Sequence, residues 1–209
     1  MKKVSELKTA GGFPDVDRFT IVQICCALAE AVDGKTVYTV GHSTRVSDYS
    51  VMVGVEMGFS GEDLFMLRLG ALLHDLGKIN IPKEVLDKPG ELTVEEWEQI
   101  RDHPITGAKI LERVDFFKEL VPVVYHHHEY HNGRGYPGEL SGSDIPVQSR
   151  IIAVADAYEA MTSTRPYRKG FSHHGAISML REAKGWQFDP DVVDSFIKSI
   201  KKLKDLRRV

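Results

Sequence analysis

The stretch Ala71-Leu-Leu-His-Asp-Leu-Gly-Lys78 decides how the rest of the chain is interpreted. An apolar run ends in adjacent histidine and aspartate, and both His74 and Asp75 carry side chains that can hold a metal ion. Gly77 is expected to end the helix that delivers them, and Lys78 places a positive charge beside anything that the metal binds. The alternative is a helix end at which His74 and Asp75 merely cap the helix and face solvent.

The composition is that of an ordinary globular protein. The 209 residues are 42% apolar and 27% charged, with a formal net charge of −3, which argues against a general DNA-binding protein. The neighbouring Cys25 and Cys26 have neither zinc-ligand nor disulfide spacing, so we expect buried thiols in a reducing compartment. No apolar run has transmembrane length, and residues 1–10 lack a signal-peptide core. We expect a cytoplasmic chain with no membrane partner, or a cytoplasmic part of a longer protein.

Helical periodicity runs through the sequence, and no clear alternating strand pattern is present. On the first helix we expect Phe19, Ile24, Leu28 and Val32 to share the apolar face. We predict a single all-α domain at residues 36–209, preceded by a more loosely attached N-terminal helical segment at residues 1–35. The pattern predicts helices near residues 15–32, 37–57, 60–74, 93–100, 116–130, 146–161, 172–184 and 189–206, a short one through Ile110 and Leu111, and loops at 79–92 and 132–144.

Seven histidines and aspartates are candidate metal ligands, and most of them lie on the apolar side or at the end of these helices, where an unpartnered ionisable group is costly. Seven nitrogen and oxygen donors fit two metal ions that share a carboxylate, and Asp75 is the natural bridge. His126 is left out, because adjacent helical residues diverge by about 100°. Packed core histidines and a buried, hydrogen-bonded Asp156 are the plainer alternatives. The candidate ligands are His42, His74, Asp75, His103, His127, His128 and Asp156.

Imidazole and carboxylate ligands without thiolate disfavour a closed structural zinc site. We expect two divalent metal ions as cofactors. Iron and manganese are favoured by the donor types, and zinc, nickel and magnesium stay open.

A series of short motifs runs in order along most of the chain: His74-Asp-Leu-Gly-Lys78, Ile81-Pro82, Lys88-Pro-Gly90, His103-Pro-x-x-Gly107, His127-His-Glu129, Gly135-Tyr-Pro137, and Val154-Ala-Asp156 through Arg165-Pro-Tyr-Arg168. In these motifs the chain resembles the HD-GYP domain, a branch of the HD metal-dependent phosphohydrolases. The resemblance implies an all-α HD-type helical bundle with a metal site in its core. It also implies hydrolysis of cyclic di-GMP to linear pGpG, with further cleavage to GMP left open, in bacterial second-messenger signalling.

The resemblance also implies roles for individual residues. The seven candidate ligands match the family's metal ligands, with Asp75 and Lys78 as the catalytic residues. Lys78 matches a lysine beside the reacting phosphate, while Tyr136, Arg165 and Arg168 match positions that hold guanine and phosphate. Ion pairing of the two arginines with helix ends is the alternative. From their position beside the ligand pair, we expect Glu129 and His131 to orient a ligand histidine.

Two positions depart from the family pattern. Some members carry an acidic residue four positions before the first histidine and bind a third metal, but here that residue is Tyr38. Two metals are therefore expected rather than three. Asn132 replaces the usual aspartate before a glycine, and we expect it to serve as a turn residue.

Three other functions stay open. The substrate could be another cyclic dinucleotide, such as cyclic GMP-AMP. The chain could be a non-catalytic module that binds the dinucleotide, a GGDEF-type cyclase or a sensor domain, although degenerate members should lose ligands and all seven are present. An HD-fold di-iron oxygenase is the third, but it would not need the basic run at residues 165–169.

Overall fold

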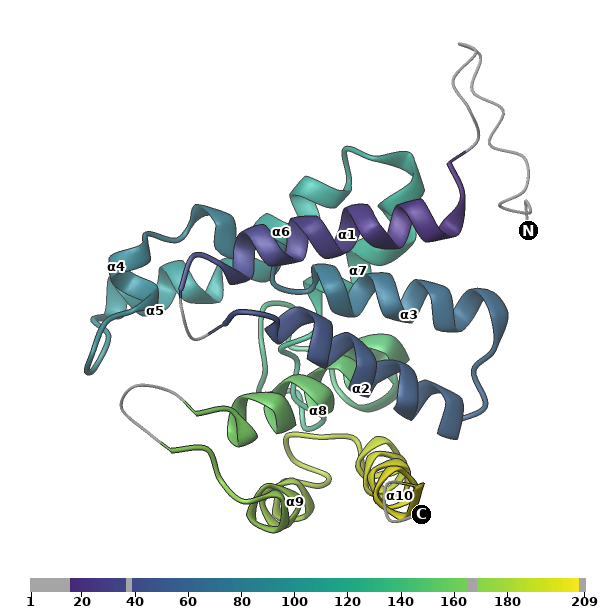
Figure 1. The fold of residues 1–209 in the computed structure, drawn as a ribbon. Coiled ribbons are helices and arrows are strands. Elements are labelled where there is room, and N and C mark those ends of the chain that lie inside the picture. Colours follow the sequence, from purple (N-terminus) through teal and green to yellow (C-terminus); the bar gives the residue numbers. More distant parts are fainter. Residues whose placement is uncertain (1–15, 37–38, 165–168, 207–209) are drawn as a thin grey trace.

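The computed structural model describes residues 16–36, 39–164 and 169–206 (Figure 1). Within these ranges all regular elements are helical, and two isolated bridges, Asn132 with Ser141 and Lys184 with Phe188, are the remaining pairings. The all-α prediction is confirmed. None of these helices is both long and apolar enough to cross a membrane. The elements are α1 (Arg18–Asp33), α2 (His42–Glu56), α3 (Gly61–Leu73), η2 (Leu76–Asn80), α4 (Lys83–Leu86), α5 (Val94–Arg101), α6 (His103–Leu111), η3 (Asp115–Leu120), α7 (Val121–Tyr125), η4 (Gly142–Asp144), α8 (Val147–Thr162), α9 (His173–Glu182) and α10 (Pro190–Leu206).

Helix α3 is the central element of the bundle. In Figure 1 it runs between α1 on one side and α2 with α8 on the other. Leu67 and Ala71 pack into a cluster formed with α2, α8, α9 and α10, while Leu69 and Leu73 pack into a second cluster with α1 and α7. Because it is buried on both sides, α3 carries the continuous apolar run seen in the sequence. Its C-terminal end, where His74 follows, therefore lies in the interior.

The buried face of α1 differs from the expected one. Ile21, Cys25 and Val32 are buried, whereas Phe19 is 72% exposed and Ile24 is 50% exposed. Apolar residues occur on two faces of this helix, so its periodicity alone could not select the face that packs. Cys25 is buried as expected, and burial raises the pKa of its thiol to about 12, whereas Cys26 is only partly buried.

Hydrogen bonds tie α1 to the elements on either side of the metal-binding motif. The Asp33 carboxylate accepts from the backbone N and the Oγ of Ser43, in the first turn of α2, at 2.9 and 2.8 Å. The Lys35 Nζ donates to the carbonyls of Lys78, Ile79 and Ile81 at 3.1, 2.7 and 2.6 Å. These bonds cross the expected boundary between residues 1–35 and 36–209. The boundary itself stays a prediction.

Gly77 does not end a helix, as we had expected. Helix α3 already ends at Leu73, and Gly77 lies within η2. A Cβ atom at Gly77 would lie 1.9 Å from the His103 carbonyl oxygen and 2.6 Å from the Gly107 nitrogen. Glycine is therefore required here because the backbone of α6, which begins with His103, approaches this closely.

Two predicted segments need correction. The loop expected at residues 79–92 contains the end of η2 and the short helix α4. The helix expected at residues 116–130 is instead the 3-10 turn η3 followed by α7, with a proline in the first turn of α7 and its end at Tyr125. His127 and His128 therefore follow a helix end rather than lie within a helix. The glycine-rich segment 132–144 is a loop as expected, except for η4 at its end.

The helix starts were predicted with mixed success. Thr93 and Glu96 form the expected capping box of α5. Ser60 precedes α3 but makes no side-chain capping bond. His103, expected outside helical geometry because it precedes Pro104, is the first residue of α6, where proline is tolerated. Asn132 serves as the expected turn residue, with its Oδ1 accepting from the Arg134 nitrogen at 3.1 Å.

We predict that Gly77→Ala destabilises the fold and displaces His103. A Cβ atom in contact with backbone atoms can be accommodated only if η2 and α6 separate, so we expect a loss of more than about 2 kcal/mol in the free energy of unfolding. Urea denaturation measures this loss. Gly175→Ala in α9 is the matched control, since its Cβ would meet side-chain atoms and no backbone atom in the described structure: the Ser172 Oγ at 3.3 Å and the Phe171 Cβ at 3.9 Å. Equal stability of the two variants would contradict the packing explanation.

Candidate metal centre

Three buried histidines at three helix ends are oriented by the same kind of hydrogen bond. In each, the ring Nδ1 hydrogen-bonds a backbone carbonyl three residues earlier, in the last turn of α3, α5 or α7, where carbonyls lack a helical partner. A carbonyl only accepts, so Nδ1 carries the hydrogen and the Nε2 lone pair is left for a metal. The bonds are His74 to Ala71 at 2.7 Å, His103 to Ile100 at 2.6 Å and His127 to Val124 at 2.6 Å.

The candidate ligands gather into two groups, and in each group three ligand atoms lie within 4.8 Å of one another. Asp156 adds to the first group, because its Oδ1 lies 3.3 Å from the His42 Nε2. All seven residues expected from the sequence thus meet in one interior region, supplied by five separate segments of the chain. The first group is His42, His74 and Asp75, and the second is His103, His127 and His128.

The two oxygens of Asp75 face different groups. Its Oδ1 lies 3.2 Å from the His103 Nε2 of the second group. Its Oδ2 lies 3.4 Å from the His74 Nε2 and 3.6 Å from the His42 Nε2 of the first group. This is the arrangement that a bridging carboxylate requires.

The arrangement of nitrogen and oxygen atoms is better explained by metal ligands than by packed core residues. The Nε2 atoms of His103 and His127 lie 3.2 Å apart, although both rings already carry their hydrogen on Nδ1. Two facing lone pairs repel each other unless a cation lies between them. The buried His74 Nε2 likewise has no hydrogen-bond partner among the described residues. One metal ion in each group would satisfy these three nitrogens.

Electrostatics keep most ligands in their metal-binding protonation state. Burial favours neutral Asp75, but Lys78, His74 and His103 outweigh it and hold the pKa of Asp75 well below its usual range. Burial lowers the pKa of His128 to about 3, so its ring is unprotonated at neutral pH. For His42 the carboxylates of Asp156 and Glu159 outweigh burial and raise the pKa to about 10. A metal ion would therefore compete with a proton at His42.

Glu159 supports the first group and was missed in the sequence. It is buried, and its Oε2 lies 2.6 Å from the His42 Nδ1. Its Oε1 accepts from the Arg45 Nε at 2.7 Å and the Ser163 Oγ at 2.6 Å. The available signal was its position three residues after Asp156, on the same face of α8. Such a carboxylate fixes the orientation of a ligand histidine.

Glu129 and His131, which we expected to orient a ligand histidine, have other neighbours. The Glu129 Oε1 accepts from the Gly138 nitrogen at 2.6 Å and lies 3.1 Å from the His126 Nδ1, so it holds a loop and a histidine outside both groups. The buried His131 Nδ1 has no hydrogen-bond partner in the described ranges. Neither residue makes the expected hydrogen bond to a ligand histidine.

The residues expected to contact substrate are only partly described. The Lys78 Nζ donates to the Asp75 Oδ2 at 2.6 Å, which places its charge beside the candidate bridge. The Tyr136 ring stacks on the His128 ring. Arg165 and Arg168 lie outside the described residues, as does Tyr38, so their roles stay predictions.

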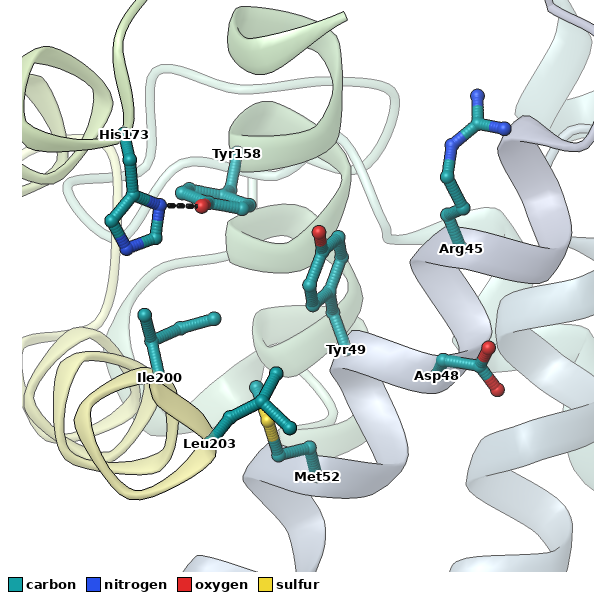
Figure 2. A pocket seen from close by; sticks show the side chains of 8 residues that line it. All are labelled: Arg45, Asp48, Tyr49, Met52, Tyr158, His173, Ile200 and Leu203. Carbon is teal, nitrogen blue, oxygen red and sulfur yellow. Dashed lines mark hydrogen bonds between the residues drawn. The ribbon is translucent and has the colours of Figure 1, made fainter. Parts of the chain in front are cut away.

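A separate cavity of about 560 Å³ lies next to Arg45, the residue that donates to Glu159 behind His42. Figure 2 shows it between α2, α8 and the C-terminal helices, with the Tyr158 hydroxyl hydrogen-bonded to the His173 Nδ1. None of its lining residues is a candidate ligand, but Arg45, which binds Glu159, forms part of the wall. The cavity is therefore distinct from the metal centre. It is lined by Arg45, Asp48, Tyr49, Met52, Tyr158, His173, Ile200 and Leu203.

Comparison with known proteins identifies the group to which this arrangement is related. A family model described as "HD domain" matches residues 27–192. The 3'3'-cGAMP-specific phosphodiesterase 3 of Vibrio cholerae is 33% identical over 204 residues, covering 98% of this chain and 44% of that protein. The cyclic di-GMP phosphodiesterase of Thermotoga maritima is 35% identical over 192 residues, covering 91% and 51%. The chain thus spans about half the length of these curated relatives, and the resemblance seen in its motifs is confirmed.

Solved structures confirm the HD-type bundle. A cyclic GMP-AMP specific phosphodiesterase of Vibrio cholerae matches with a TM-score of 0.68 at 20% identity, covering 88% of this chain and 50% of that one. A HDG"Y"P protein from Bdellovibrio bacteriovorus matches with a TM-score of 0.65 at 20% identity, covering 88% and 61%. At this level of identity the likeness concerns the fold.

We predict that Glu159→Gln weakens metal binding at the first group by about 10- to 100-fold, because His42 loses the carboxylate that orients its ring. Competition with a chromophoric chelator measures the affinity. Glu182→Gln is the matched control, since this glutamate is held only by Ser178 on the surface of α9. Unchanged affinity in Glu159→Gln would show that His42 does not depend on this carboxylate.

Proposed function

The chain belongs to the HD domain family, and we propose that it hydrolyses a phosphodiester bond of cyclic di-GMP to give linear pGpG. The observation that carries the proposal is the Asp75 carboxylate, whose two oxygens face two separate groups of metal-binding side chains. Paired metal sites that share a carboxylate are suited to hydrolysing phosphate esters.

We propose two divalent ions, iron or manganese, held by the two groups with Asp75 between them. When bound, such ions activate a water molecule and polarise the phosphate. The protein's part is to hold five imidazoles and two carboxylates at a largely buried site. The tautomers of His74, His103 and His127 are already fixed by the helix-end carbonyls.

Lys78 is the residue placed to act on the phosphate. Its ammonium group lies beside Asp75 and is partly exposed, whereas Asp75 itself is buried. As water attacks phosphorus and the bond to the ribose 3′ oxygen breaks, negative charge grows on the phosphate oxygens. A cation already held at this point stabilises that charge without having to reorganise. Lys78 therefore acts as an electrostatic catalyst rather than as a proton donor.

The names of the relatives support a cyclic dinucleotide as the substrate class. Cyclic di-GMP is favoured because relatives with this activity in their names match 91% and 86% of the chain at 35% identity. A second candidate is 3'3'-cyclic GMP-AMP, since the relative that covers 98% of the chain is named for it. A GGDEF-type cyclase or a sensor domain as partner stays a prediction.

We predict that the metal-loaded protein hydrolyses cyclic di-GMP and that Asp75→Asn lowers kcat/KM by at least about 100-fold, because the amide cannot bridge two ions through two anionic oxygens. Product chromatography with cyclic di-GMP and 3'3'-cyclic GMP-AMP in parallel measures both the rate and the preference. Asp102→Asn, close in sequence to the ligand His103 but exposed, is the matched control. A fully metal-loaded protein that binds either dinucleotide without cleaving it would favour the non-catalytic module.

We predict that removing the metal with a chelator abolishes hydrolysis and that Fe²⁺ or Mn²⁺ restores it. The five imidazole ligands suit these ions, whereas Mg²⁺ alone should fail because it prefers oxygen ligands. Metal analysis should give two ions per chain in the restored protein. Full activity in Mg²⁺ with no transition metal bound would contradict this assignment.

A further inference from the structure

His128 is the one ligand histidine whose ring nitrogens make no hydrogen bond in the described part of the chain. The Nδ1 atoms of His74, His103 and His127 are bound to carbonyls, and the Nδ1 of His42 is bound to Glu159. A ligand ring that lacks such a bond needs another way to fix its orientation.

A stack of three side chains supplies that restraint. The Tyr136 ring lies 4.9 Å from the His128 ring, with an angle of 24° between the two planes. The Arg101 guanidinium carbon lies 4.7 Å from the centroid of the same tyrosine ring. Both groups therefore contact the same ring, and their contacts restrict its rotation. They also occupy ring surface that a substrate base would need for stacking.

The loop that carries Tyr136 is held in register against the segment that carries His128. The Tyr136 backbone nitrogen donates to the His128 carbonyl at 3.2 Å, and the Gly138 nitrogen donates to Glu129 at 2.6 Å. At Gly135 a Cβ atom would lie 2.2 Å from the Tyr130 nitrogen, so the loop backbone lies directly on this segment. These contacts fix the tyrosine ring over the histidine.

We infer that Tyr136 and Arg101 are positioning residues for the metal ligand His128, rather than a binding surface for the substrate base. The inference rests on the proposed metal centre but not on any particular substrate. The last turn of α5 then contributes two contacts. The Ile100 carbonyl orients His103, and the neighbouring Arg101 stacks on Tyr136, which in turn stacks on His128. One helix end thereby orients two of the three histidines in the second group. Guanidinium stacking on an aromatic face provides this restraint while one side of the arginine stays in water.

Metal binding in three variants tests the inference. Tyr136→Leu removes the stacking ring, Arg101→Met removes the guanidinium but keeps a long stem, and Tyr136→Phe keeps the ring without its hydroxyl. We expect the first two to weaken the binding of one of the two metal ions by about 10- to 100-fold in chelator competition, with Tyr136→Phe close to wild type. In hydrolysis assays at limiting metal, KM should stay within about twofold while kcat falls with the occupancy of the second group, and saturating metal should restore kcat.

Two substitutions serve as matched controls. Arg113→Met changes an exposed arginine away from the stack. Tyr125→Leu changes a tyrosine that packs against His126, at 4.8 Å, outside both groups. Both should leave metal affinity unchanged. If Tyr136→Leu fails to fold by circular dichroism, Arg101→Met decides the question, because the exposed arginine is not part of the core.

A raised KM with unchanged metal affinity in Tyr136→Leu and Arg101→Met would overturn the inference. It would indicate that Tyr136 binds the substrate. The metal measurement stands apart from the proposed function. A protein that binds two ions but cleaves neither cyclic dinucleotide would contradict the function, while its metal affinities would still decide the role of the stack.

Discussion

Hydrogen bonds from imidazole Nδ1 atoms to the carbonyls of helix ends are the constraint on which the rest of this structure depends. Each bond has two effects. It gives a hydrogen-bond donor to a carbonyl at the helix end, and it fixes which ring nitrogen keeps its lone pair. Three helix ends must converge for this to work. The bundle is therefore arranged so that α3, α5 and α7 end at the same interior region, with His74, His103 and His127 delivered there.

The surrounding packing serves this convergence. Helix α3 can end in the interior because both of its faces are covered, one by α1 and α7 and the other by α2 and α8. Gly77 allows the backbone at the start of α6 to approach η2, and without that approach His103 could not reach Asp75. Lys35 binds three carbonyls of the same turn from outside. The segment that carries Asp75, the candidate bridge, is thus held from both sides.

Much of the site could be predicted from the sequence, because each ligand sits in a short motif and seven donors need a common partner. What could not be predicted depends on pairs of segments far apart in the chain. The role of Gly77 depends on α6, 26 residues further on. Glu159 gives no sign of its role until α2 lies against α8. The stack on Tyr136 includes Arg101, to which no motif drew attention.

The helix predictions that were wrong failed for similar reasons. The apolar residues of α1 lie on two faces, and only the packing of α3 selects Ile21 and Cys25 over Phe19 and Ile24. The segment 116–130 has the apolar content of one helix, but Pro122 starts a new one, and its early end frees His127 and His128 to turn inward. Local propensity was overridden at the helix end that precedes two of the candidate ligands.

The central claim is that Asp75 bridges two metal ions, one in each group. Anomalous diffraction from crystals of the Mn²⁺-loaded protein tests it most directly. The account predicts two peaks roughly 3.5–4 Å apart, each within bonding distance of a different Asp75 oxygen, one among His42, His74 and Asp156 and the other among His103, His127 and His128. A single peak, or two ions of which Asp75 binds only one, would contradict it.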